Sequence, residues 1–98
     1  MSDIPRITEA LLHVDDNKLA DFLMVEYAKN EMLIKLSKKR LDGKGDWHHP
    51  TKCNNEHLLR SLINHVSKGD MVDVLNIAAM ILLRNQLYGE KTLITGDL

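Results

Sequence analysis

The chain has 98 residues, of which 44% are hydrophobic and 28% are charged, a length that allows one compact domain but not two with separate cores. Its 13 basic residues nearly balance its 14 acidic residues, so the net charge of −1 excludes a general binder of polyanions or polycations and leaves only a local patch for that role. Aromatic residues are 4% of the chain, and a core of aliphatic side chains favours packed helices over a β-sandwich. We therefore expect a single all-α domain over residues 1–98.

The N-terminal half contains two helical patterns. Apolar residues first recur at three- and four-residue spacing, at Ile4, Ile7, Leu11 and Val14. This spacing predicts a short amphipathic helix over about residues 3–14, with Asp3 as its N-cap. A long helix is predicted to follow over roughly residues 17–41. Its apolar residues occupy two neighbouring faces, which is more than one partner helix covers.

Residues 42–54 form the segment without periodicity. It contains Gly43, Gly45 and Pro50, which interrupt regular structure. Loops of about a dozen residues inside a compact domain are often functional. We therefore expect the function of the protein to lie in this loop.

The C-terminal half predicts two further helices joined by a tight turn. The first spans roughly residues 55–67 and is expected to end before Gly69, in the position of a left-handed C-cap. The second is expected to start at Asp70, which with Asp73 forms an acidic variant of the capping box. Beyond Gly89, residues 90–98 are expected to be a flexible tail.

The fourth predicted helix is apolar nearly all round from Met71 to Leu83, so it should lie in the middle of the assembly. Two shorter helices do not cover both this surface and the wide apolar face of residues 17–41. We therefore expect a small bundle of about four helices that is completed by homo-oligomerisation.

A basic stretch surrounds the start of the loop. Cations, flexible backbone amides and a stacking ring are the components of a phosphate or nucleotide site. The same run would also suit a solvated helix end, where cations complement the helix dipole. The candidate residues for binding a ligand or a partner are Lys38, Lys39, Arg40, Lys44, Trp47, His48 and His49.

Two other groups have the composition of metal ligands. Asp70, Asp73 and Asn76 are three residues apart on one side of a helix, where oxygen ligands can share Mg²⁺, although acids at a helix start need no metal to explain them. Nitrogen and sulfur ligands that suit zinc also cluster in and after the loop, but their spacing matches no established zinc finger, and a solvated loop explains them equally well. This second group is His48, His49, Cys53 and His57.

Two stretches of the chain resemble small accessory proteins of tailed bacteriophages and prophages. The first runs from Lys39 to Cys53 and reads Lys-Arg-x-x-Gly-x-Gly-x-Trp-x-x-Pro-x-x-Cys, and the second runs from Leu59 to Met80. The resemblance covers about half of the chain. It implies a phage protein that acts inside the bacterial host cell, in the cytoplasm. A single cysteine agrees with that compartment, and the longest apolar run falls short of a membrane span.

A shorter segment, from Gly69 to Asn76, is similar to the second metal-binding helix of MazG-like nucleotide pyrophosphohydrolases. These are all-α oligomers that cleave nucleoside triphosphates with Mg²⁺ held by two carboxylate pairs on two helices. The resemblance implies that Asp70 and Asp73 stand for one pair. The other pair is missing, since Glu26 and Glu31 are five residues apart and lie on different faces.

The sequence therefore leads to two functional hypotheses. The first is a phage accessory protein without catalysis or cofactor, which binds a host protein as inhibitor or adaptor, or binds a nucleotide through the basic loop; a nucleic acid is a less favoured ligand. The alternative is a MazG-like, Mg²⁺-dependent pyrophosphohydrolase, in which Mg²⁺ would be held by Asp70, Asp73, Glu26 and Glu31. A third, structural interpretation gives the loop only a role in assembly.

Overall fold

A computed structural model describes residues 4–89, which form four α-helices and no strand. The helices are α1 (Ile4–Leu11), α2 (Asn17–Leu41), α3 (Asn55–Lys68) and α4 (Met71–Tyr88). The predicted all-α class is confirmed, and the helices start and end close to the expected residues, except that α1 ends three residues before Val14. The predicted N-cap Asp3 and the predicted flexible tail 90–98 lie outside the described residues.

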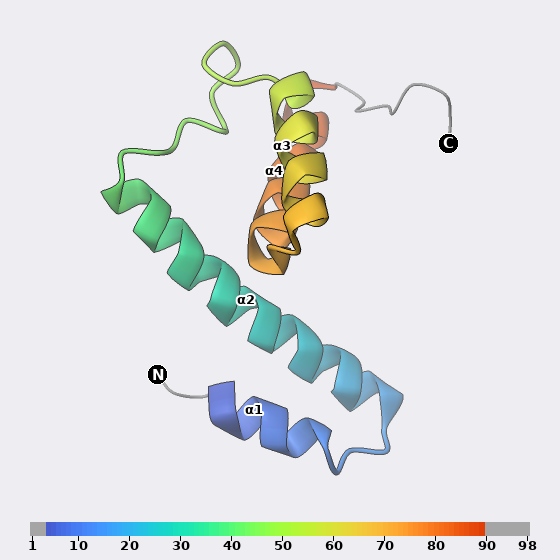
Figure 1. The fold of residues 1–98 in the computed structure, drawn as a ribbon. Coiled ribbons are helices and arrows are strands. Elements are labelled where there is room, and N and C mark those ends of the chain that lie inside the picture. Colours follow the sequence, from blue (N-terminus) through green and yellow to red (C-terminus); the bar gives the residue numbers. More distant parts are fainter. Residues whose placement is uncertain (1–3, 90–98) are drawn as a thin grey trace.

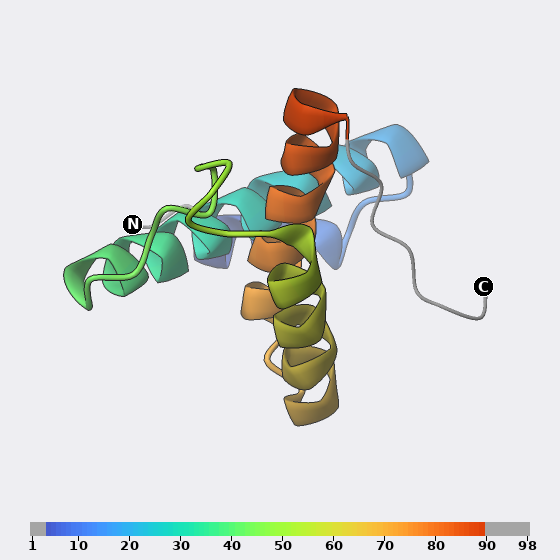
Figure 2. The same ribbon diagram turned by 90° about the horizontal axis from the view of Figure 1, so that it is seen from above.

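The helices pack in a chain of three contacts. α3 and α4 form a hairpin, α2 crosses α4, and α1 packs on α2 (Figure 1). Seen from above, α2 runs across the α3–α4 hairpin at a steep angle rather than alongside it (Figure 2). Residues 42–54 connect the C-terminal end of α2 to the start of α3. α4 thus packs against both α3 and α2, but its apolar surface is not covered all round, since Leu82 is 70% exposed and Leu87 is 59% exposed.

Side-chain and backbone caps fix the helix ends. Asp16 accepts a hydrogen bond from the amide of Lys18 at 2.9 Å, and Asn54 accepts one from the amide of His57 at 2.8 Å. Gly69 adopts a left-handed conformation with φ of 79°, which confirms the predicted C-cap of α3. Asp70 occupies the N-cap position of α4, as expected, but the capping box does not form, because the Asp70 side chain makes no cap hydrogen bond and lies against His65 instead.

The apolar core lies between α3 and α4. Leu58, Ile77 and Ile81 are its buried residues, and Leu62 and Met80 pack against them. In contrast, none of the 25 residues of α2 is buried. None of the described helices is both long and apolar enough to cross a lipid bilayer.

Candidate ligand-binding pocket

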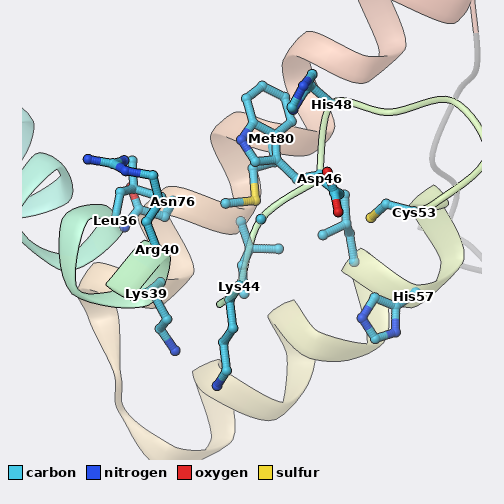
Figure 3. A pocket seen from close by; sticks show the side chains of 14 residues that line it. Leu36, Lys39, Arg40, Lys44, Asp46, His48, Cys53, His57, Asn76 and Met80 are labelled. Atoms are coloured by element: carbon cyan, nitrogen blue, oxygen red, sulfur yellow. The ribbon is translucent and has the colours of Figure 1, made fainter. Parts of the chain in front are cut away.

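A pocket of about 360 Å³ lies where the loop meets three helices (Figure 3). The C-terminal end of α2, the start of α3 and the middle of α4 each contribute side chains to its wall, and residues 44–48 of the loop complete it. The basic loop therefore covers a cavity rather than projecting into solvent as a free chain.

The inner wall of the pocket is apolar. Leu58 and Ile77 come from the core, and Leu36, Met80 and the half-buried Trp47 add to this apolar surface. An indole and a thioether are flat or adaptable apolar surfaces against which a ring can pack. This wall fits the apolar part of a ligand better than a fully hydrated ion.

The outer wall carries positive charge. Lys39 and Arg40 contribute from α2 and Lys44 from the loop, with the carboxylate of Asp46 as the one negative group in the lining. In the close view, Lys39 and Lys44 extend in the same direction, and the ring of His57 lies across from Lys44 (Figure 3). Cations around an apolar cavity favour an anionic group at its opening.

Arg84 of α4 holds the loop in place. Its side chain is 0% exposed, and its Nη1 donates to the carbonyl oxygens of Trp47 at 2.8 Å and His49 at 2.9 Å. Its Nε donates to the side-chain oxygen of Asn55 at 2.8 Å. One planar guanidinium thus connects α4, the loop and the start of α3, and the neighbouring Trp47 side chain becomes part of the pocket wall.

Two further contacts reinforce the attachment of the loop. We call the whole arrangement the Arg84 clamp; it consists of the loop carbonyls and the side chains of Arg84, Asn55, Asn85 and Tyr88. The hydroxyl of Tyr88 donates to the carbonyl oxygen of His48, and its ring centroid is 5.0 Å from the guanidinium carbon of Arg84. Asn55 donates to the side-chain oxygen of Asn85 at 2.7 Å. Since buried polar groups are costly when unpaired, these contacts fix one loop conformation.

A charged cluster joins α2 to the start of α4 beside the pocket. The carboxylate of Asp73, 6% exposed, lies 3.3 Å from Lys35 and 3.6 Å from Lys39. His65 lies 3.6 Å from Asp73 and 3.2 Å from Asp70. Burial opposes ionisation of Asp73, but the hydrogen bond from Lys35 and the charges of Lys39, Lys35 and His65 outweigh it and hold its pKa below the usual value.

The pocket unites most of the residues predicted to bind a ligand. Lys39, Arg40, Lys44, Trp47 and His48 all line it, whereas Lys38 and His49 are not among the lining residues. The imidazole of His49 instead accepts hydrogen bonds within the loop, from the amides of Thr51 at 3.2 Å and Lys52 at 3.3 Å. His49 therefore stabilises the local turn, because the two amides lie only two and three residues after it in the chain.

The predicted metal ligands are brought together only in part. Within residues 4–89, the group of three or more candidate ligands close enough to share an ion is His65, Asp70 and Asp73, whose ligand atoms lie within 4.8 Å of one another. Glu26 and Glu31 do not belong to it; Glu26 pairs with Lys29 at 3.2 Å, and Glu31 lines a groove on α2. The loop histidines and Cys53 form no such group either.

Sequence reasoning missed the central residue of the clamp. The sequence drew attention to the apolar run from Met71 to Leu83 and not to the arginine that follows it. A signal was nevertheless present, because Asp73, Ile77, Ile81 and Arg84 follow one another at spacings of four, four and three along the buried face of α4. A single arginine that continues the spacing of buried residues along a helix indicates a buried polar contact.

Comparisons with known proteins add no relative to this description. No family model matches the chain, and neither a curated protein nor a solved structure is significantly similar to it. The resemblances to phage accessory proteins and to MazG-like enzymes therefore stay predictions from the sequence.

Proposed function

We propose that the protein binds a nucleotide, or a phosphorylated compound of similar shape, in the pocket beneath the loop. The observation that carries this proposal is the combination of an apolar inner wall with cations at its edge, held together by the Arg84 clamp. The pocket volume of about 360 Å³ falls in the range of small-molecule sites.

The two walls suit the two parts of such a ligand. Lys39 and Lys44, which extend in the same direction, can form charge-assisted hydrogen bonds to phosphate oxygens, whereas Arg40 extends away from them (Figure 3). Trp47 and Met80 offer surfaces on which a base can pack, an interaction that tolerates different bases because each has a π-face. The clamp supports binding further, since a loop that is already ordered loses little entropy when the ligand arrives.

The biological setting rests on the resemblance to phage accessory proteins. It favours action by binding, without catalysis, in the cytoplasm of a bacterial host. A host protein that is inhibited or adapted by the complex, and a homo-oligomeric assembly, are partners that the sequence predicts. The pocket is the ligand-binding part of this function.

The alternative, a Mg²⁺-dependent pyrophosphohydrolase, has one observation in its favour, the group of His65, Asp70 and Asp73. The donors fit Mg²⁺ poorly, because this ion prefers oxygen ligands and one donor here is an imidazole nitrogen. Lys35 and Lys39 also already neutralise Asp73. Release of pyrophosphate from deoxynucleoside triphosphates, lost in Asp73→Ala, would favour this alternative over binding alone.

Isothermal titration calorimetry with a panel of nucleotides, together with inorganic tripolyphosphate, tests the proposal. We expect a nucleotide to bind, and Lys44→Gln to weaken its binding by about tenfold through loss of one phosphate contact. Lys38→Gln is the matched control, since Lys38 belongs to the same basic run but does not line the pocket. Absence of binding across the panel, or equal losses in the two variants, would contradict the proposal.

A further inference from the structure

Lys39 belongs both to the ligand pocket and to the charged cluster beside it. It lines the pocket from the C-terminal end of α2, and its Nζ lies 3.6 Å from Oδ1 of Asp73 on α4. Asp73 itself is not among the lining residues. The ammonium of Lys39 is therefore the point at which a buried carboxylate can act on the pocket.

The other cations of the pocket have no such partner. Within residues 4–89, neither Arg40 nor Lys44 forms an ion pair. A lysine carries its charge on a flexible four-carbon stem, so it loses rotamer entropy when its ammonium is held in one place. Lys44 loses this entropy when a phosphate arrives, whereas Lys39 is already held by Asp73.

Asp73 is suited to hold an ammonium. It is 6% exposed, its Oδ2 lies 3.3 Å from Lys35, and its Oδ1 faces Lys39. Burial raises the pKa of Asp73, but the hydrogen bond from Lys35 and the neighbouring positive charges outweigh it, so the carboxylate is ionised at neutral pH. An ammonium has three donors, so Lys39 can keep its contact with Asp73 and offer the other two to a phosphate.

We propose that Asp73 is a positioning residue of the pocket, which holds the ammonium of Lys39 where phosphate oxygens bind and does not touch the ligand itself. This role rests on the proposed nucleotide function. It separates two lysines of α2 that pair with the same carboxylate, because Lys39 lines the pocket and Lys35 does not. Since Lys39 and Lys44 extend in the same direction, one phosphate group can contact both α2 and the loop (Figure 3).

The direction of the effect of Asp73→Asn separates positioning from simple charge. Removal of a carboxylate near a bound phosphate lowers repulsion, so binding should tighten if charge alone matters. Loss of positioning has the opposite sign, because the ligand must then order the side chain of Lys39. We expect nucleotide and inorganic tripolyphosphate to bind about fivefold more weakly, the size expected for one long side chain that loses its fixed position.

Isothermal titration calorimetry of a double-mutant cycle tests the proposal. Lys39→Gln should weaken binding by about tenfold through loss of a phosphate contact. Asp73→Asn added to Lys39→Gln should weaken it no further, since Asp73 acts through Lys39. Lys35→Gln is the matched control, because it removes a partner of the same carboxylate but not a lining residue, and it should not weaken binding.

Three results would overturn the positioning role. These are unchanged or tighter binding by Asp73→Asn, an equal loss from Asp73→Asn with and without Lys39, and an equal loss in Lys35→Gln, which would show that affinity follows the stability of the junction. Absence of nucleotide binding by the wild-type protein would contradict the proposed function itself, and the positioning role with it.

Side-chain relaxation in the wild-type protein gives a measurement that needs no variant. NMR order parameters of the lysine ε-methylene groups should be higher for Lys39 than for Lys44 in the free protein. The difference should narrow when the protein is saturated with nucleotide, because the ligand then orders Lys44 as well. Equal order of the two groups in the free protein would contradict a role of Asp73 in positioning.

Discussion

The two parts of the molecule meet at α4 and differ in what they bury. The part formed by residues 42–54, α3 and α4 contains the apolar core and the Arg84 clamp, and its loop is tied down by hydrogen bonds from buried side chains. The part formed by α1 and α2 leaves large apolar side chains in solvent, and α2 buries none of its residues. Large apolar side chains are exposed in both parts, Leu82 of α4 among them, so the two parts differ in what they enclose: one has buried polar contacts, and the long helix of the other has no buried residue.

The difference indicates two kinds of binding surface. Buried polar contacts are retained where one conformation must be specified, here that of a loop over a pocket. Contiguous exposed apolar surface marks an interaction site. Most residues of the proposed nucleotide site belong to the first part. Three substitutions test this division.

Replacement of Arg84 has the largest expected effect. Arg84→Met keeps the length of the side chain but leaves the carbonyls of Trp47 and His49 without their donor, so the free energy of unfolding should fall by about 3 kcal/mol. Trp47 should also lose its fixed position, which weakens nucleotide binding. Urea unfolding and calorimetry measure the two effects.

The matched control is Arg60→Met, since Arg60 pairs with Glu56 at 2.7 Å but its side chain is 76% exposed. Loss of such a surface pair should cost about 0.5 kcal/mol. Similar losses of stability in the two variants would show that the clamp contributes no more than an exposed ion pair.

The fold was predictable where its cause is local. Periodicity and caps placed the helices, because Asp16, Asn54 and Gly69 act on their own neighbours in the chain. The basic residues of the pocket were found because side-chain charge is visible in a sequence.

Contacts that depend on how helices cross were not predictable in the same way. Arg84 binds backbone carbonyls, which every residue carries, so no residue type signals its partners. Asp73 meets Lys35 and Lys39 only because α2 crosses α4 at that point. Asp70 is at the N-cap of α4, but its side chain makes no capping hydrogen bond for a related reason, since His65 from the preceding helix competes for its carboxylate.

Acid should weaken the junction between the two parts. The pKa of Asp73 is lowered in the folded state, so its ionised form stabilises the fold above the unfolded-state pKa near 3.8, and this contribution is lost as the pH falls below that value. Asp73→Asn should lower stability at pH 7 and reduce the loss of stability as the pH falls from about 4 to about 2. Urea unfolding at several pH values measures both.

The control is Asp21→Asn, a carboxylate on the exposed surface of α2. It should leave the stability at pH 7 within about 0.5 kcal/mol of the wild type, as surface substitutions usually do. If Asp73→Asn is equally neutral at pH 7, the cluster with Lys35 and Lys39 does not hold α2 against α4.

The smallest expected effect concerns the charge of the pocket alone. Asp46 has a positive φ of 65°, and asparagine tolerates this left-handed region as aspartate does. Asp46→Asn should therefore keep the loop conformation while removing the one carboxylate among the lining residues. Less repulsion should tighten nucleotide binding by about threefold, or roughly 0.6 kcal/mol.

Asp42→Asn separates this local effect from a change in net charge, because Asp42 caps the end of α2 and does not line the pocket. Calorimetry at low and high salt should show a gain only for the Asp46 variant, and a smaller gain at high salt, where exposed charges are screened. Equal gains would mean that the ligand responds to the overall charge of the chain. Weaker binding by Asp46→Asn would instead indicate that the carboxylate of Asp46 contacts the ligand and accepts a hydrogen bond from a hydroxyl or an amine. The edge of the pocket would then be a mixed polar surface rather than a cationic one.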